Sequence, residues 1–225
     1  NIKYLLLLKQ MNMTNLQKQI ENLNQTMSSQ LPQEILNAFA DSIADLKKDR
    51  IEDRSFRKGM KARSFSLKSS QGKTINSDNL LGEYDKIILV FFRGDWCPYC
   101  NLELRALQEA LSRIENKKAK LIAVSPQKQE YSSDMREKNQ LSFDILFDKD
   151  NTLANQFGIS FNLQDFVVPY YLQLGIDLNV HNGNNQNALP IPAVFVIDKD
   201  YNITYSFVDA DYTSRVDIEE LIKNL

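Results

Sequence analysis

Residues 87–100 read IILVFFRGDWCPYC, and this stretch decides the fold. Its first six residues are β-branched, aliphatic or aromatic, and charged residues close the run at Lys86 and Arg93. A run of this length and composition favours a short buried strand over a helix. Gly94 and Asp95 then break the strand, so the sequence predicts a buried strand that ends just before two cysteines.

A helix is predicted to start at Pro98, because four apolar residues then recur on one helical face: Leu104, Leu107, Leu111 and Ile114. Proline is well suited to the first helical position, where no N–H is needed, and this makes Cys97 the N-cap. The free N–H groups and the positive end of the helix dipole favour a thiolate there. Cys100 lies one turn further on the same face, within disulfide reach. We therefore expect a redox dithiol, with Cys97 as the exposed nucleophile and Cys100 one turn deeper.

Other uses of the two cysteines are weaker interpretations. They are the only cysteines in the chain, which argues against a four-cysteine zinc site. The single histidine, His181, is distant in sequence and lies in an Asn- and Gly-rich segment, so we expect a solvated surface residue. A free Cys can also be an ordinary core residue, but the strand–turn–helix context with a proline between the cysteines favours redox chemistry. We expect no metal and no cofactor.

Composition is typical of a globular protein, with 225 residues, 43% hydrophobic and 25% charged. The net charge of −2 gives no reason to expect a nucleic-acid surface. The longest apolar runs are far shorter than a membrane span of about 20 residues. Residues 4–8 are too short a run for the core of a signal peptide, and Met11 or Met13 is an alternative start. With a redox-type cysteine pair and no export signal, we expect a reducing cytoplasm.

Residues 1–54 are predicted to form an N-terminal helical extension. Leu16, Ile20, Leu23 and Met27 form a seam typical of packed helices, and Pro32 separates it from a second apolar stripe between Ile35 and Leu46. Amphipathic helices usually face their own core, so we favour packing on the same chain. A homodimer contact is the alternative.

Residues 55–225 are predicted to form one α/β domain. Strands are expected at 65–67, 74–75, 87–92, 119–124, 143–147, 193–197 and 203–208, with helices after Pro98 and at 127–140, 148–157 and 216–225. Alternating strands and helices in the middle imply parallel pairing, and the last two strands form an antiparallel hairpin. Residues 159–190 are an aromatic-rich insertion that roofs the core, shapes a substrate cleft or makes a subunit contact. The predicted fold is therefore a central mixed sheet flanked by helices.

These features resemble a thioredoxin-like fold. More specifically, residues 92–101 (FRGDWCPYCN), 191–198 (IPAVFVID) and 208–215 (VDADYTSR) resemble peroxiredoxin-like proteins of the AhpC/TSA (redoxin) family. The resemblance covers about residues 55–220. The N-terminal helices contribute little to it.

The resemblance implies a thiol-dependent peroxidase that reduces hydrogen peroxide or organic hydroperoxides. Cys97 would attack the O–O bond and become a sulfenic acid, which Cys100 would resolve to a disulfide. A thioredoxin- or glutaredoxin-type partner would then reduce that disulfide. Pro192 matches the cis-proline of thioredoxin folds, so a cis Ile191–Pro192 bond is expected.

The sequence departs from the family at two positions. The Thr or Ser that normally stands three residues before the nucleophile is replaced by Gly94, and residues 191–197 lack the usual arginine. Arg93 and Arg215 are candidate cations that would lower the thiol pKa and bind a peroxide oxygen. An inert surface charge is the alternative for Arg93. Asp95 is expected to face solvent or to pair with a base.

Five residues are candidates for substrate binding: Trp96, Pro98, Tyr99, Pro192 and Arg215. Trp96 is expected to shield the sulfur, in a packing or a catalytic role. The CPYC pattern also occurs in glutaredoxins, which makes a thiol–disulfide oxidoreductase the second hypothesis. A non-catalytic interaction module whose N-terminal helices bind a partner is the third.

Overall fold

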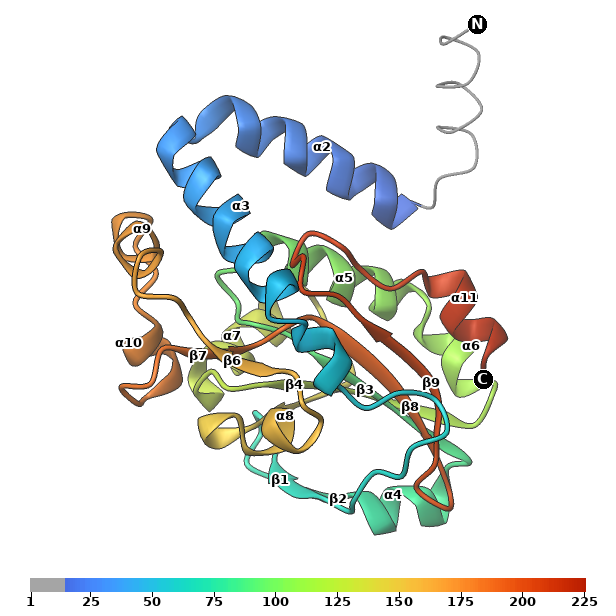
Figure 1. Cartoon of the computed structure of the whole chain (residues 1–225). Coiled ribbons are helices and arrows are strands. Elements are labelled where there is room, and N and C mark those ends of the chain that lie inside the picture. Colours follow the sequence, from blue (N-terminus) through green and yellow to red (C-terminus); the bar gives the residue numbers. More distant parts are fainter. Residues whose placement is uncertain (1–14) are drawn as a thin grey trace, which may run out of the picture.

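A computed structural model describes residues 15–225 (Figure 1). The strands are β1 (Ser66–Lys68), β2 (Thr74–Asn76), β3 (Lys86–Phe91), β4 (Ala119–Ser125), β5 (Asp144–Phe147), β6 (Ser160–Asn162), β7 (Ala188–Pro190), β8 (Ala193–Asp198) and β9 (Ile203–Val208). The α-helices are α2 (Asn15–Gln30), α3 (Gln33–Lys48), α4 (Ser77–Glu83), α5 (Pro98–Glu109), α6 (Leu111–Glu115), α7 (Gln129–Lys138), α8 (Thr152–Gln156), α9 (Val168–Gln173), α10 (Leu178–Asn182) and α11 (Ile218–Lys223). Two short 3₁₀ helices are η1 (Ile51–Arg54) and η2 (Lys149–Asn151). The sequence predictions about a signal peptide and an alternative start fall on residues 1–14, outside the described part of the chain.

The five-stranded central sheet has the order β5-β4-β3-β8-β9. Strands β3, β4 and β5 are parallel to one another, whereas β8 is antiparallel to both β3 and β9. The predicted mixed sheet is therefore confirmed. The predicted strand in residues 87–92 lies at its centre and is buried on both faces, which explains its uninterrupted apolar sequence.

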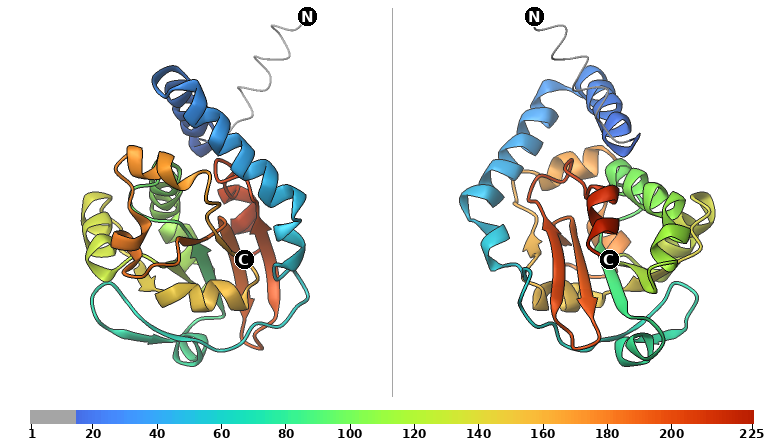
Figure 2. Two further views of the ribbon diagram at one scale, coloured as in Figure 1. Left: turned by 60° about the vertical axis from the view of Figure 1, so that its left-hand side comes forward. Right: turned by 90° about the vertical axis from the view of Figure 1, so that its right-hand side faces the viewer.

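Alternate residues of β3 face two separate cores. Ile88 and Val90 pack with α5, α6, α7 and α11, and Ile87 and Leu89 pack with α8 and residues 46–81. Figure 2 shows α3 on one side of β8 and β9, with α5, α6 and α11 on the other. This layering places the start of α5, and with it both cysteines, at the end of the central strand.

The N-terminal helices pack on their own chain, as their apolar stripes indicated. Leu16 of α2 is buried, and Ile20 and Leu23 lie against the core that contains α5. Ala38 of α3 joins a third cluster, which contains Val167 and other residues of the insertion. The boundary between residues 54 and 55 stays a prediction.

The insertion contains β6, α9, α10 and β7, and β6 pairs with β7 in an antiparallel ladder. It is partly helical, as predicted, and together with α3 it covers the edge of the sheet where the cysteines lie (Figure 1). No helix within residues 15–225 has the length and apolar character that a membrane crossing requires.

The expected cis Ile191–Pro192 bond is wrong, because no peptide bond within residues 15–225 is cis. The Ile191 N–H donates to the Ile159 carbonyl (2.8 Å), and the Pro192 carbonyl accepts from the Asp209 N–H (3.3 Å). These bonds hold the chain extended from β7 into β8. A trans bond keeps the chain extended here, whereas a cis bond would shorten the Cα–Cα step to about 2.9 Å.

Candidate active site

Cys97 is the N-cap of α5, as predicted. It has extended backbone angles (φ −88°, ψ 110°), and Pro98 follows as the first helical residue. The Asn101 side-chain amide donates to the Cys97 carbonyl (2.9 Å) and to the Asp95 carbonyl (2.7 Å), which fixes the turn. Both cysteines are free thiols.

The expectation that Cys97 is exposed is wrong. Cys97 and Cys100 are both 0% exposed. Two arginines contact the sulfurs, and aromatic residues pack around those arginines. The structure therefore places the dithiol inside the protein, in a charged and aromatic enclosure.

Arg93 lies directly against the Cys97 sulfur. Its Nη2 is 3.2 Å from Cys97 Sγ, and its Nη1 donates to the Tyr171 hydroxyl (2.9 Å). The guanidinium carbon lies 3.9 Å from the centroid of the Tyr212 ring and 5.0 Å from that of Trp96, which allows cation–π contacts with both rings. The residue is only 5% exposed, so the interpretation of Arg93 as a surface charge is wrong.

Arg215 approaches the dithiol from the C-terminal part of the chain. Its Nη2 is 3.4 Å from Cys100 Sγ and 3.9 Å from Cys97 Sγ. Its Nη1 forms an ion pair with Glu103 Oε2 at 2.7 Å, and the side chains of this pair are 0% and 1% exposed. Two contacts to the Tyr212 carbonyl complete the fixation of the guanidinium.

These contacts separate the two thiols electrostatically. Burial by itself raises the pKa of the Cys97 thiol, but the hydrogen bond with Cys100 and the charges of Arg93 and Arg215 together hold that pKa well below its ordinary value. Burial and the hydrogen bond with Cys97 raise the pKa of Cys100 well above its ordinary value. The arrangement therefore favours one thiolate, on Cys97, and one protonated thiol, on Cys100.

Gly94 has a steric reason for lacking a side chain. A Cβ built on Gly94 would overlap the Trp96 indole at Nε1. The Nε1 atom is buried and has no hydrogen-bond partner. An indole N–H therefore occupies the space next to Gly94 where the family usually has a hydroxyl.

Asp95 pairs with a base, as expected. Its carboxylate lies 3.4 Å from His181 Nδ1, and its N–H donates to Gln127 Oε1 (2.7 Å). Burial raises the pKa of Asp95, against an opposing effect of the His181 charge. The expectation that His181 is a solvated surface residue is wrong, because its side chain is 16% exposed and its ring lies 4.4 Å from that of Tyr131. The insertion brings His181 here although it is distant in sequence.

The remaining predicted residues lie around the dithiol in different ways. Pro98 is exposed, and Pro192 lines the same pocket as Arg93. Tyr99 is buried, and its hydroxyl donates to Asn24 Oδ1 of α2 (2.6 Å). Its ring packs edge-on against Tyr212, with centroids 5.6 Å apart.

Sequence reasoning missed Glu103, Tyr171 and Tyr212. Glu103 left a readable signal, since it is a charged residue on the apolar face of α5 directly before Leu104. Such a residue is rarely buried without a partner of opposite charge. Tyr171 lies in the aromatic-rich insertion, but its contact with Arg93, like that of Tyr212, depends on α9 and the loop after β9 meeting beside the dithiol.

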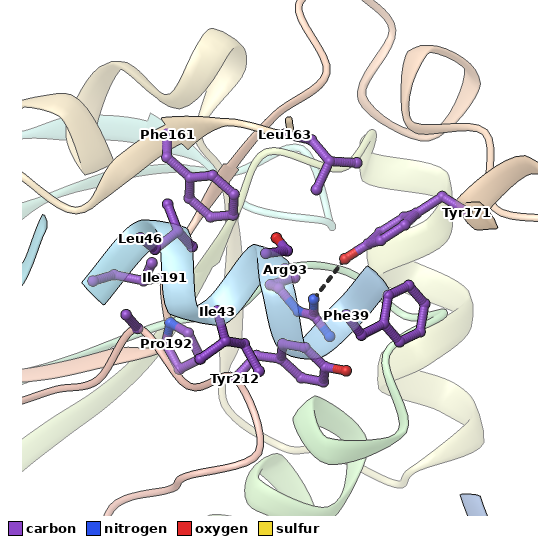
Figure 3. Close-up of a pocket in the computed structure, with 12 residues that line it drawn as sticks. Phe39, Ile43, Leu46, Arg93, Phe161, Leu163, Tyr171, Ile191, Pro192 and Tyr212 are labelled. Atoms are coloured by element: carbon purple, nitrogen blue, oxygen red, sulfur yellow. Dashed lines mark hydrogen bonds between the residues drawn. The ribbon is translucent and has the colours of Figure 1, made fainter. Parts of the chain in front are cut away.

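A small pocket lies over Arg93 (Figure 3). Its cavity is about 10 Å³, which is room for roughly one water-sized molecule. Helix α3, the insertion and the loop after β9 supply its mostly apolar walls: Phe39, Ile43, Phe161, Leu163, Tyr171 and Tyr212. Among residues 15–225, Arg93 is the one charged residue in its lining.

Two neighbouring free cysteines at the start of a helix, on a mixed five-stranded sheet, are typical of a redox protein with a thioredoxin-like fold. Residues 59–206 match the AhpC/TSA family, and the chain therefore belongs to that family. Helices α2 and α3 lie outside the matched residues.

Bacterial peroxiredoxins are among the similar sequences. The chain is 29% identical over 112 residues to a putative peroxiredoxin bcp of Coxiella burnetii, which covers 50% of this chain and 73% of that protein. It is 32% identical over 101 residues to peroxiredoxin Bcp of Bacillus subtilis, covering 45% of this chain and 63% of that protein. The alignment thus spans less than two thirds of the Bacillus protein.

Solved peroxiredoxin structures share the fold. The crystal structure of peroxidoxin BcpB from Mycobacterium tuberculosis has a TM-score of 0.59 at 17% identity, and the match covers 75% of this chain and 96% of that one. A yeast mitochondrial 1-Cys peroxiredoxin has a TM-score of 0.55 at 20% identity and covers 74% of this chain and 73% of its own. These similarities confirm the thioredoxin-like fold predicted from the sequence.

Proposed function

We infer that the protein is a thiol-dependent peroxidase of the peroxiredoxin type, with Cys97 as the nucleophile. The observation that supports this best is the position of Cys97 at a helix N-terminus, with Arg93 Nη2 at 3.2 Å and Arg215 Nη2 at 3.9 Å. Two fixed cations stabilise a thiolate, and they also offer N–H donors to a peroxide oxygen. Family membership and the similarity to proteins named peroxiredoxin point the same way.

In the first step the Cys97 thiolate attacks one peroxide oxygen, so an S–O bond forms and the O–O bond breaks. Cys97 is oxidised to a sulfenic acid, and the other oxygen leaves as water or an alcohol after taking up a proton. Negative charge develops on the leaving oxygen. The proposed donors to it are Arg93, whose buried Nε has no other partner, and the unpartnered Trp96 Nε1–H.

In the second step Cys100 resolves the sulfenic acid. The Cys100 sulfur attacks the Cys97 sulfur as the S–O bond breaks, and the proton that Cys100 loses is taken up by the departing hydroxyl, which leaves as water. Arg215 Nη2, 3.4 Å from Cys100 Sγ, would stabilise the developing thiolate. The product is a Cys97–Cys100 disulfide, in which neither sulfur is oxidised to a sulfinic acid.

A dithiol reductant of the thioredoxin or glutaredoxin type would then supply two electrons by disulfide exchange. A reducing cytoplasm is the proposed location, because such reductants are maintained there. A homodimer stays a prediction, which light scattering on the purified protein would test. Binding of nucleic acid is not expected from the net charge of −2.

The test is a stopped-flow reaction of the reduced protein with hydrogen peroxide, followed by the fluorescence of Trp96, the only tryptophan. We expect oxidation far faster than that of a free thiol and its loss in Cys97→Ser. Cys100→Ser should still be oxidised, and a sulfenic-acid reagent should label it at Cys97. A rate equal to that of free cysteine, together with rapid reduction of a glutathione mixed disulfide, would instead establish the thiol–disulfide oxidoreductase.

A further inference from the structure

Helix α3 closes the pocket that leads to Arg93. The Phe39 ring lies edge-on against Tyr171, with centroids 5.5 Å apart, and against Tyr212 at 6.3 Å. The same two tyrosines hold the Arg93 guanidinium, one by its hydroxyl and the other by its ring face. Figure 3 shows Phe39 beside these groups, with Ile43 and Leu46 continuing the α3 wall.

Polar contacts hold α3 in this position. Ser42 Oγ donates to Gln164 Oε1 of the insertion (2.7 Å), and Gln164 Nε2 donates to Asp45 Oδ2 (3.1 Å). At the end of the helix, Lys47 forms an exposed ion pair with Asp209 (3.7 Å). Helix α3 is therefore held both to the insertion and to the loop after β9, which are two walls of the pocket.

The remaining space limits what can reach Arg93. A cavity of about 10 Å³ holds roughly one water-sized molecule. Hydrogen peroxide has two heavy atoms and needs only a small side-chain shift to fit. A hydroperoxide that carries an aromatic or long alkyl group needs the volume that Phe39 and Ile43 now fill.

Two larger clefts border the same region but not Arg93. One lies between α2 and α5 beside Pro98, and the other lies between α2 and β9 beside Arg215. Arg93 lines neither of them, whereas it lines the pocket under α3. A peroxide that must contact Arg93 therefore meets α3 first.

We propose that α3 selects the peroxide by size, with Phe39 as the specificity-determining residue, so that hydrogen peroxide is accepted and bulky organic hydroperoxides are rejected. This inference rests on the proposed peroxidase function and narrows its substrate class. It also assigns a role to a helix that lies outside the part of the chain that matches the family.

The experiment compares single-turnover oxidation by hydrogen peroxide and by cumene hydroperoxide in the full chain. The variant is Phe39→Ala, and the matched control is Phe166→Ala, which removes an exposed phenylalanine (48%) from the insertion. We expect Phe39→Ala to raise the ratio of the cumene hydroperoxide rate constant to the hydrogen peroxide rate constant at least about tenfold. Phe166→Ala should leave the ratio of the two rate constants as in the wild type.

An unchanged ratio in Phe39→Ala would overturn the proposal, as would a wild-type protein that reacts with both peroxides equally fast. Such a result would mean that substrate arrives through one of the clefts beside α2. Ile43→Ala provides a second opening of the same wall if Phe39→Ala does not fold, which thermal melting would reveal. If hydrogen peroxide fails to oxidise Cys97 even in the wild type, the proposed peroxidase function is wrong, and so is the proposed selection by size.

Discussion

The Arg93 guanidinium contacts the Cys97 sulfur at 3.2 Å although the two residues lie on opposite sides of the turn between β3 and α5. Tyr171 and Tyr212 hold the guanidinium from its other sides, so it has little freedom to move away. Together with the hydrogen bond from Cys100, this contact and the neighbouring Arg215 hold the pKa of the Cys97 thiol below its ordinary value.

Arg93→Met should raise the pKa of Cys97 towards the ordinary value of about 8.5, because a charge that favours the thiolate is lost while burial remains. Less thiolate is then present at pH 7, so oxidation by hydrogen peroxide should slow by about tenfold or more. The ultraviolet absorbance of the thiolate, followed against pH, measures the shift directly. Arg105→Met is the control, since Arg105 is an exposed residue of α5 that donates to Asn139. An unaltered titration of Cys97 would assign the activation to Cys100, Arg215 and the helix N-terminus without Arg93.

Glu103→Ala should destabilise the protein by roughly 3–5 kcal/mol, because it leaves the buried Arg215 charge without its ion-pair partner. Urea unfolding measures the loss. The matched control is Glu219→Ala, which breaks the exposed pair with Arg113 and should cost far less stability. Equal losses in the two variants would show that Arg215 finds other partners once Glu103 is gone.

Gly94→Ser tests the steric account of the missing hydroxyl. The new Cβ would overlap the Trp96 indole, so the ring must move, at a cost of roughly 1–3 kcal/mol. We expect a shifted Trp96 emission spectrum and a lower melting temperature. Gly82→Ser is the control, because a Cβ at Gly82 in α4 meets no atom within 4 Å. An unchanged emission spectrum in Gly94→Ser would contradict the overlap.

Asp148 should make stability depend on pH in an unusual direction. Burial raises its pKa from 3.8 to about 6, while the N–H groups of Leu153 and Ala154 donate to its carboxylate and oppose that shift. The folded state thus binds the proton more tightly than the unfolded state does. The stabilisation is complete below about pH 4 and is lost as the pH rises through 6, up to about 3 kcal/mol in all.

The measurement is the free energy of unfolding between pH 4 and 7 in the wild type and in Asp148→Asn. The difference between the two free energies isolates Asp148 from the other carboxylates. The stability of the wild type relative to Asp148→Asn should fall as the pH rises from 4 to 7. Asp165→Asn, which changes an exposed position, is the control. A pH-independent difference between Asp148→Asn and the wild type would show that the carboxyl titrates normally in the folded protein.

The sequence determined the features that depend on neighbouring residues. The apolar run after Lys86 favoured a buried strand, and Pro98 favoured the start of a helix with Cys97 as its cap, as the structure shows. The β8–β9 hairpin and the parallel β3–β4–β5 unit followed from the same local patterns. These elements were sufficient to predict the fold and the position of the dithiol at the start of a helix.

Only the tertiary structure decided what surrounds the dithiol. Arg215 lies 118 residues from Cys97, and Tyr171 lies 78 residues from Arg93, so no local pattern links them. The burial of Cys97, the pairing of Asp95 with His181 and the trans Ile191–Pro192 bond likewise depend on segments that are distant in sequence and meet in the folded protein. Local chemistry set the position of the sulfur along the chain, but long-range packing of α3, the insertion and the loop after β9 set its charge environment and its access.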